Sequence, residues 1–163
     1  MTRQYARAPR GERAHGDAPK NWGESISLAA GIRLQGLIAP LVLRGSMTGD
    51  AFEAYVEQFV LPSLHPGDVV LWDNLGAHKR TGVRELVESV GATVIFLPPY
   101  SPDLNPIELA WSKVKTLLRG HAARSWDQLL DAVVAALSAI STTDIANWFR
   151  HCGYFHQGHG KAL

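Results

Sequence analysis

The stretch that decides the fold class spans residues 68–97 and reads DVVLWDNLGAHKRTGVRELVESVGATVIFL. Its two ends, 68–73 and 92–97, are short apolar runs between turn residues, which is typical of buried strands. Between them, residues 81–90 predict a helix that Gly91 ends. A strand, a helix and a strand in this order form a crossover, so the two strands should run parallel with helices covering the sheet. The stretch therefore predicts an α/β protein.

The residues before this stretch predict a hairpin followed by one helix. Residues 25–33 and 37–44 are apolar runs, and Leu34-Gln35-Gly36 between them indicates a hairpin turn. Pro40 favours an edge strand or a bulge, because proline has no N–H for a strand ladder. Thr48 then precedes an apolar stripe at helical spacing, which Pro62 and Pro66-Gly67 close: Phe52, Tyr55, Val56, Phe59 and Val60.

The residues after the stretch predict two helices and one further turn. Asn105-Pro106-Ile107-Glu108 is a strong helix start, with asparagine as the N-cap and proline in the first position. That helix should end at Gly120. Ser125 begins a helix that runs to about Ile140, and residues 143–150 predict one short helical turn more.

Composition excludes several classes of protein. The 163 residues are 46% apolar and 19% charged with a net charge of +1, which indicates one soluble domain with its own core. The single cysteine, Cys152, cannot form an internal disulfide, and no stretch resembles a signal peptide, so we expect a cytoplasmic protein. A run of about 18 apolar residues is absent, which excludes a membrane span.

Charge is concentrated in the first twenty-four residues, which we expect to form a basic extended arm. In the first twenty residues the basic side chains outnumber Glu12 and Asp17, and they are Arg3, Arg7, Arg10, Arg13 and Lys20. Such an arm suits a phosphate backbone, although for the arm taken alone we favour a solvated or disordered tail.

Two carboxylates are the main candidates for chemistry. Asp73 ends an apolar strand and should lie at the carboxyl edge of the parallel sheet, where α/β folds bind their ligands. Glu108 lies in the first turn of a helix, whose positive end keeps it ionised. Together they would repel unless a divalent cation lay between them, and Mg²⁺ prefers oxygen ligands. Singly, Asp73 could belong to a plain turn and Glu108 to a capping box.

Two sequence strings carry a family resemblance. Residues 69–78, VVLWDNLGAH, and 97–108, LPPYSPDLNPIE, closely resemble the mariner-like branch of DDE transposases found in bacterial insertion sequences. The spacing of Asp73 and Glu108 matches that of the last two acidic residues in this branch. The resemblance extends from Ala8-Pro9-Arg10-Gly11 to the helix ending near Gly120, and more weakly to residues 149–154.

The resemblance implies an RNase H-like fold, a mixed sheet flanked by helices, in which Asp73 and Glu108 are catalytic and bind metal. It also implies two Mg²⁺ or Mn²⁺ ions about 3.5–4 Å apart that serve DNA cleavage and strand transfer at transposon ends. The expected domains are the arm at 1–24, an incomplete DDE catalytic domain at 25–120, and C-terminal helices with a tail at 121–163. The expected partners are transposon-end and target DNA.

The chain departs from the family at its beginning. The family's first Asp normally ends a central strand ahead of the Arg-rich segment, which here starts at Met1, so we expect that strand and its Asp to be missing. Asp17 and Asp50 do not follow apolar strand runs and are poor substitutes. We expect weak or no cleavage by this chain alone, and marginal stability or association with itself or a full-length transposase. The alternatives are a non-catalytic fragment that binds DNA or interferes with the enzyme, and an inert remnant of a decayed element.

Weaker candidates accompany the two carboxylates. His78 could approach the site or a phosphate, and Lys115 shares a helix face with Glu108 and could contact a DNA backbone; a loop histidine and a solvated lysine are the simpler interpretations. The remaining candidate DNA contacts are Arg3, Arg7, Arg10 and Arg13. One tail set has zinc-compatible residue types but no spacing that fits a closed site, so we favour a packed tail: His151, Cys152, His156 and His159.

Overall fold

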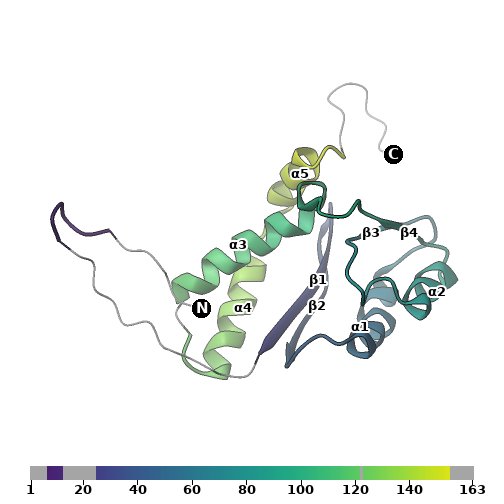
Figure 1. Cartoon of the computed structure of the whole chain (residues 1–163), viewed down its shortest axis with the longest axis horizontal. Coiled ribbons are helices and arrows are strands. Elements are labelled where there is room, and N and C mark those ends of the chain that lie inside the picture. Colours follow the sequence, from purple (N-terminus) through teal and green to yellow (C-terminus); the bar gives the residue numbers. More distant parts are fainter. Residues whose placement is uncertain (1–6, 13–24, 122, 155–163) are drawn as a thin grey trace.

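The structure is a computed structural model, which describes residues 7–12, 25–121 and 123–154 (Figure 1). The predicted hairpin is confirmed: β1 (Ile26–Arg33) pairs antiparallel with β2 (Gly36–Arg44), and Gly36 opens β2 instead of lying in the turn. The register shifts between Ala29 and Gly31, opposite Ala39 (φ +50°) and the exposed Pro40. The expected bulge therefore lies at Pro40. Proline has no backbone N–H, and at the bulge this costs the β1–β2 ladder no hydrogen bond.

The predicted crossover is also confirmed. β3 (Val69–Trp72) and β4 (Thr93–Phe96) pair parallel, and α2 (Thr81–Ser89) connects them before Gly91, at φ +78°, ends the helix. The prediction that both strands are buried on two faces is wrong. Val69 is 56% and Ile95 47% exposed, because the described helices pack on one face of this pair only.

The first core lies between the crossover and the helix that precedes it. α1 (Gly49–Tyr55) begins at Thr48, whose Oγ1 accepts the N–H of Ala51 at 3.2 Å, and it continues as a π-helical turn, η1 (Val56–Val60), and a 3₁₀ turn, η2 (Leu61–Ser63). The core's buried side chains come from α1, η1, α2, β4 and the residue before β4: Phe52, Tyr55, Val56, Val60, Val83, Val87, Ala92 and Val94. Phe59 is exposed, contrary to the predicted stripe, because the wider π-helical turn changes the angular spacing of side chains.

Three helices form the other half of the structure. α3 (Pro106–His121) packs against α4 (Trp126–Ser138) and α5 (Thr142–His151), and the buried residues of this group are Pro106, Ala110, Val114, Ala132, Val133, Ala136 and Ile145. The helix predicted to end at Gly120 runs on to His121. The single turn predicted at 143–150 is a helix of ten residues, since Ser141 and Asp144 form a capping box at its start.

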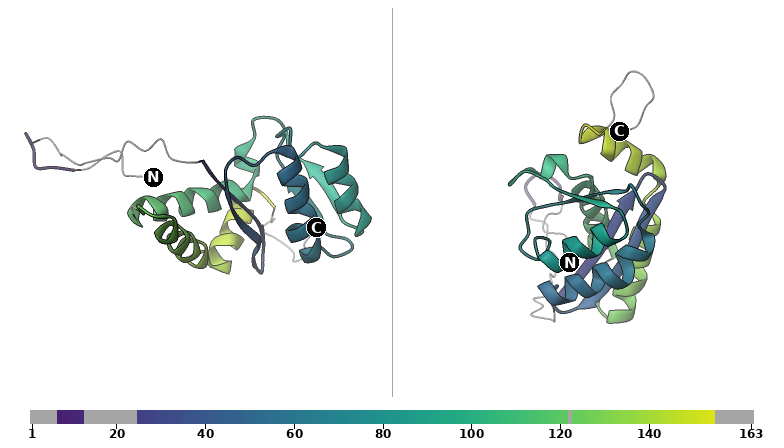
Figure 2. Two further views of the ribbon diagram at one scale, coloured as in Figure 1. Left: turned by 90° about the horizontal axis from the view of Figure 1, so that it is seen from below. Right: turned by 90° about the vertical axis from the view of Figure 1, so that its right-hand side faces the viewer.

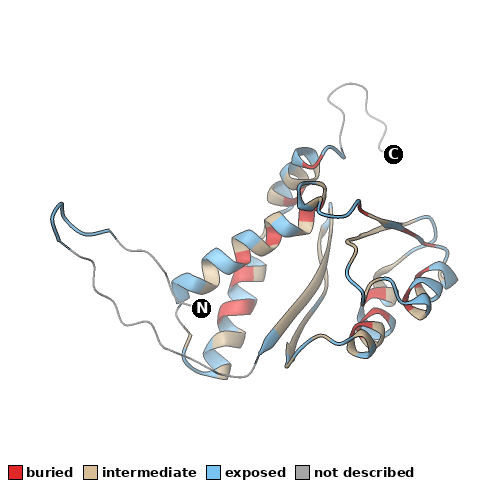
Figure 3. Cartoon of the chain, in the orientation of Figure 1, coloured by how far each residue is buried: buried red, intermediate tan, exposed pale blue. Residues whose placement is uncertain are grey.

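The hairpin stands between these two halves (Figures 1 and 2). Buried residues concentrate on α3 and α4 on one side and on α1 and α2 on the other (Figure 3). The described strands form two separate two-stranded sheets, β1–β2 and β3–β4, which stand apart where the expected fold places a central strand. Among the described residues, no single helix is long and apolar enough to cross a membrane, and only the bent pair α4–α5, at 70°, has the length and composition together.

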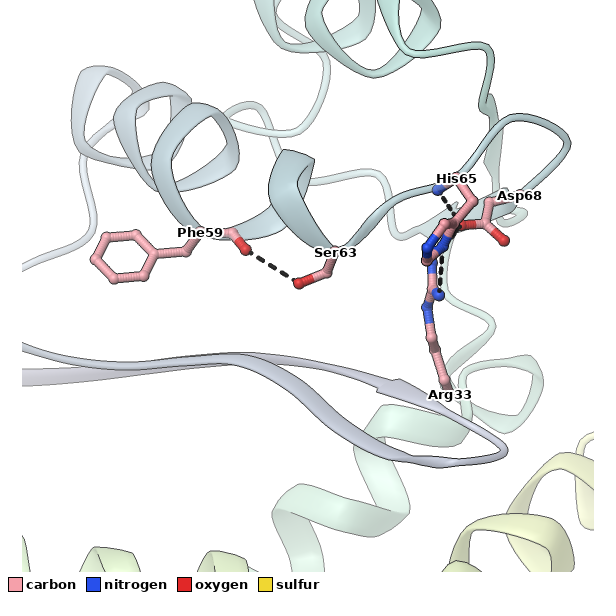
Figure 4. A network of polar contacts seen from close by, with 5 residues as sticks. All are labelled: Arg33, Phe59, Ser63, His65 and Asp68. Carbon is pink, nitrogen blue, oxygen red and sulfur yellow. Dashed lines mark hydrogen bonds and ion pairs between the residues drawn. The ribbon is translucent and has the colours of Figure 1, made fainter.

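Side chains link the hairpin to both halves. At its tip, Arg33 donates to the Asp68 carboxylate and approaches His65 Nδ1 at 3.3 Å, and Asp68 also accepts the N–H of His65 at 2.7 Å (Figure 4). At its other end, the guanidinium of Arg44 lies 4.1 Å from the ring centroid of Trp126, at the start of α4. These contacts join elements that share no backbone ladder.

Candidate active site

Asp73 follows the last residue of β3. The ladder ends where the N–H of Leu97 donates to Trp72 O at 2.8 Å, and Asp73 Oδ1 then accepts the N–H of Leu75 at 3.1 Å. This is an Asx turn, so the plain-turn interpretation describes the local backbone correctly. The turn uses one carboxylate oxygen, and Oδ2 has no hydrogen-bond partner among the described residues. The carboxylate therefore keeps one oxygen for a ligand.

The ends of β3 and β4 are held together by Asn74. Its Nδ2 donates to the carbonyl oxygen of Leu97, directly after β4. The contact fixes the position of the residue that follows Asp73 relative to the loop that leads to α3. Sequence reasoning missed this role of Asn74. The only sequence signal for it is the Asp73-Asn74 pair directly after an apolar strand.

A proline-rich loop carries Glu108 to the same edge. After Pro98 and Pro99, the short 3₁₀ turn η3 (Pro102–Leu104) leads to Asn105, which is buried, and α3 begins at Pro106. Glu108 lies in the first turn, and its N–H donates to Asn105 O at 3.0 Å. The loop thus brings the start of α3 to the cleft at the ends of β3 and β4.

One cleft of about 240 Å³ brings the two carboxylates together. Its walls include Asp73 and Asn74 after β3, Leu97 and Pro98 after β4, and Asn105 and Glu108 at the start of α3. Within the described residues, no lysine or arginine lines it. The cleft is thus an acidic pocket at the carboxyl ends of parallel strands, the usual ligand position in α/β folds.

His78 contacts Asp73 but does not itself line the cleft. Its Nδ1 lies 2.6 Å from Asp73 Oδ1, and the side chain is 17% exposed. The ring lies between Phe52 and Trp72, with centroid distances of 4.4 and 5.8 Å. His78 therefore lies beside Asp73, as the sequence suggested, and it is also a loop histidine, because residues 76–79 form a turn between β3 and α2.

The other predicted residues lie apart from the cleft. Lys115 is exposed further along α3, and Arg7 and Arg10 are exposed in the arm, while Arg3 and Arg13 lie outside the described residues. Asp50 is almost fully exposed at the start of α1, pairs with Arg80 at 2.7 Å and does not line the cleft. Asp17 lies outside the described residues.

The C-terminal set gives no sign of zinc. Across residues 7–12, 25–121 and 123–154, no three His, Cys, Asp or Glu side chains are grouped as metal ligands, and His156 and His159 lie outside these ranges. Cys152 is buried, and burial, followed by the charge of Asp103, raises the pKa of its thiol. A residue that sequence reasoning missed is nearby: Tyr154 Oη donates to Leu104 O at 2.7 Å and so braces η3.

The donor set fits a hard divalent cation. Asp73 and Glu108 offer carboxylate oxygens in a cleft that brings no competing cationic side chain, and Mg²⁺ and Mn²⁺ favour oxygen ligands. A cation would also relieve the repulsion between the two negative charges. Asp73 and Glu108 are therefore the residues that would hold such an ion.

The parallel crossover and the acidic cleft at its carboxyl edge define an α/β domain. A family model described as DDE superfamily endonuclease matches residues 1–130, and the chain belongs to this family. A search of the curated proteins gives no match.

Solved structures of Mos1 share the fold. The Mos1 strand transfer complex has a TM-score of 0.72 at 15% identity, with 94% of this chain and 48% of that chain covered. The Mos1 mariner paired end complex with Mn gives 0.70 at 17% identity, covering 94% and 49%. The catalytic domain of the Mos1 mariner transposase gives 0.62 at 15% identity, covering 78% and 70%. The chain therefore has the RNase H-like fold, and it spans about half the length of the chains in the two complexes.

Proposed function

We propose that the chain is part of the catalytic domain of a mariner-like transposase. That domain would carry out Mg²⁺- or Mn²⁺-dependent DNA cleavage and strand transfer at the ends of a bacterial insertion sequence. The observation that carries the proposal is the cleft in which Asp73 and Glu108, from separate elements, meet without a cationic neighbour. The family match and the Mos1 fold support it. Transposon-end and target DNA in the cytoplasm would be the substrates.

The residues around the cleft would have distinct roles. Asp73 and Glu108 would hold the metal, and divalent ions at such sites activate the attacking hydroxyl and stabilise the leaving oxygen at phosphorus. The N–H of Leu75 holds Asp73 Oδ1, His78 lies beside the same oxygen, and Asn74 joins the strand ends. Since the cleft is acidic, contacts to DNA phosphates must come from surfaces outside it, for which the arm's arginines and Lys115 are the candidates.

Metal binding and plasmid nicking test the catalytic proposal. Asp73→Asn and Glu108→Gln should each weaken Mn²⁺ binding in calorimetry and reduce any metal-dependent nicking of supercoiled plasmid. Asp50→Asn is the matched control, because Asp50 is an exposed carboxylate outside the cleft and should leave Mn²⁺ binding unchanged. Unchanged Mn²⁺ affinity in both cleft variants would reject the proposed site.

A second candidate is a non-catalytic role in DNA binding or interference. The cleft holds two carboxylates among the described residues, whereas the DDE family that the sequence resembles has three metal-binding acids. The smaller number of metal ligands favours weak catalysis. A binding fragment would keep salt-sensitive DNA affinity in Asp73→Asn and Glu108→Gln, and it would lower the activity of a full-length transposase through mixed assembly. A chain with neither metal-dependent nicking nor DNA affinity would be the inert remnant.

A further inference from the structure

Tyr100 is the exposed aromatic side chain at the mouth of the acidic cleft. Its ring is fully exposed, and its backbone lies at φ +57°, a conformation that L-residues other than Asn and Asp seldom adopt. Pro98, Pro99 and Pro102 surround it, so the loop has little freedom to rotate the ring away from solvent. Folding gains nothing from a strained, solvated tyrosine, and such outliers are characteristic of ligand sites.

A second apolar side chain lines the same cleft from another loop. Leu75 is 59% exposed in the turn after Asp73, and both Leu75 and Tyr100 belong to the cleft's lining. The cleft thus combines two carboxylates with apolar side chains that are exposed to solvent. No lysine or arginine in the lining is available to bind a phosphate directly.

The chemistry of this lining favours a neutral, flat ligand group. A phosphate outside the metal's reach would be repelled by Asp73 and Glu108, whereas a nucleobase is uncharged and stacks on aromatic rings. Bases inside a duplex already stack on their neighbours, so only an unpaired base at a frayed end or overhang has a free face to offer.

We propose that Tyr100, flanked by Leu75, is a stacking platform for an unpaired nucleobase next to the phosphate that reacts in the cleft. This inference rests on the proposed function, because it assigns part of the same DNA substrate. It predicts that the protein prefers DNA with an unpaired end over a blunt duplex, and that the preference depends on the ring of Tyr100.

The test measures affinity for a fluorescent duplex with a short 3′ overhang, the same overhang with abasic sites, and the blunt duplex, at fixed salt and Mg²⁺. Tyr100→Asn removes the ring and tolerates the positive φ, and Tyr100→Gly removes the ring and the backbone strain together. Tyr100→Phe keeps a ring. Phe59→Asn is the matched control, since Phe59 is an exposed aromatic outside the cleft.

The expected result is a loss of about five- to a hundredfold in overhang affinity for Tyr100→Asn and Tyr100→Gly, with Tyr100→Phe close to the unmodified chain. The abasic overhang should show no further loss in these variants, because the stacking partner is already gone. Overhang affinity that is unchanged in Tyr100→Asn overturns the platform but leaves the proposed function intact. A chain that binds none of the three DNAs overturns the proposed function as well. Self-association that disappears in Tyr100→Asn without a change in DNA affinity would instead assign the ring to a second copy and overturn the inference.

Discussion

His78 Nδ1 lies 2.6 Å from Asp73 Oδ1, the same oxygen that accepts the N–H of Leu75 at 3.1 Å. The 2.6 Å contact with His78 lacks hydrogen-bond geometry, so the ring places a nitrogen beside the oxygen that the Asx turn already holds, while Oδ2 accepts no hydrogen bond among the described residues. Outer contacts of this kind commonly change metal affinity by about 10- to 100-fold. His78 is therefore a positioning residue for the proposed metal site.

Replacement of His78 should weaken metal binding without removing it. We expect His78→Ala to lower Mn²⁺ affinity by about tenfold or more in calorimetry, and His78→Asn, which keeps a polar group beside Asp73, to recover part of the loss. His121→Ala is the control, because His121 is exposed at the far end of α3. Circular dichroism must show that the variant still folds, since the ring packs on Phe52. Equal Mn²⁺ affinity for His78→Ala and the unmodified chain would contradict this role.

Asn74 should contribute to stability as well as to the site. Its side chain donates to Leu97 O between the ends of β3 and β4, in a partly buried position. We expect Asn74→Ala to lower the free energy of unfolding by about 1–2 kcal/mol, because the carbonyl of Leu97 loses its partner. Urea unfolding measures this. Asn147→Ala, which removes the exposed contact of Asn147 with Arg150, should cost far less.

The sequence was most informative where the determinants are local. The crossover, the hairpin with its bulge at Pro40 and the helix start at Pro106 all follow from short patterns of apolar, proline and capping residues. Exposure of Val69 and Ile95 could not be predicted in this way, because it depends on which elements cover the sheet. The exposure of Phe59 depends on a π-helical turn, which has no simple sequence signature.

The candidate site shows the same division. Asp73 and Glu108 could be singled out because each lies at a recognisable strand end or helix start. The bond from Asn74 to Leu97 and the bond from Tyr154 to Leu104 join residues far apart in the sequence, so only the fold reveals them. The exposed ring of Tyr100 depends on a backbone conformation that the surrounding prolines suggest but do not specify.

The α3–α5 contact should be sensitive to acid. Lys113 Nζ donates to Asp144 Oδ2 at 2.7 Å, and this bond, followed by bonds from Ser141, lowers the pKa of Asp144 to about 2. Because the folded pKa lies below the unfolded value, the contribution of Asp144 to stability is present above about pH 4 and is lost as the pH falls toward 2.

Thermal melting between pH 2 and pH 5 tests this link. Lys113→Met should lower the melting temperature most above about pH 4, and the difference from the unmodified chain should shrink as the pH falls. Lys115→Met is the matched control, since Lys115 is exposed on the same helix. A difference that stays constant across the range would show that Lys113 acts through packing and not through the Asp144 charge.

Tyr55 should make the first core sensitive to alkali. Its Oη donates to Ala39 O at 2.8 Å, at the hairpin bulge, and burial raises the pKa of its phenol to about 12. In the unfolded chain the phenol ionises near its ordinary value of about 10, whereas the folded chain holds the proton up to about 12. Stability should therefore fall as the pH rises from about 10 to 12, because ionisation favours the unfolded state. Tyr55→Phe should cost about 1 kcal/mol at neutral pH, where it loses the hydrogen bond, and should show a smaller alkaline decline in urea unfolding. An identical alkaline decline in both proteins would assign the effect to other groups.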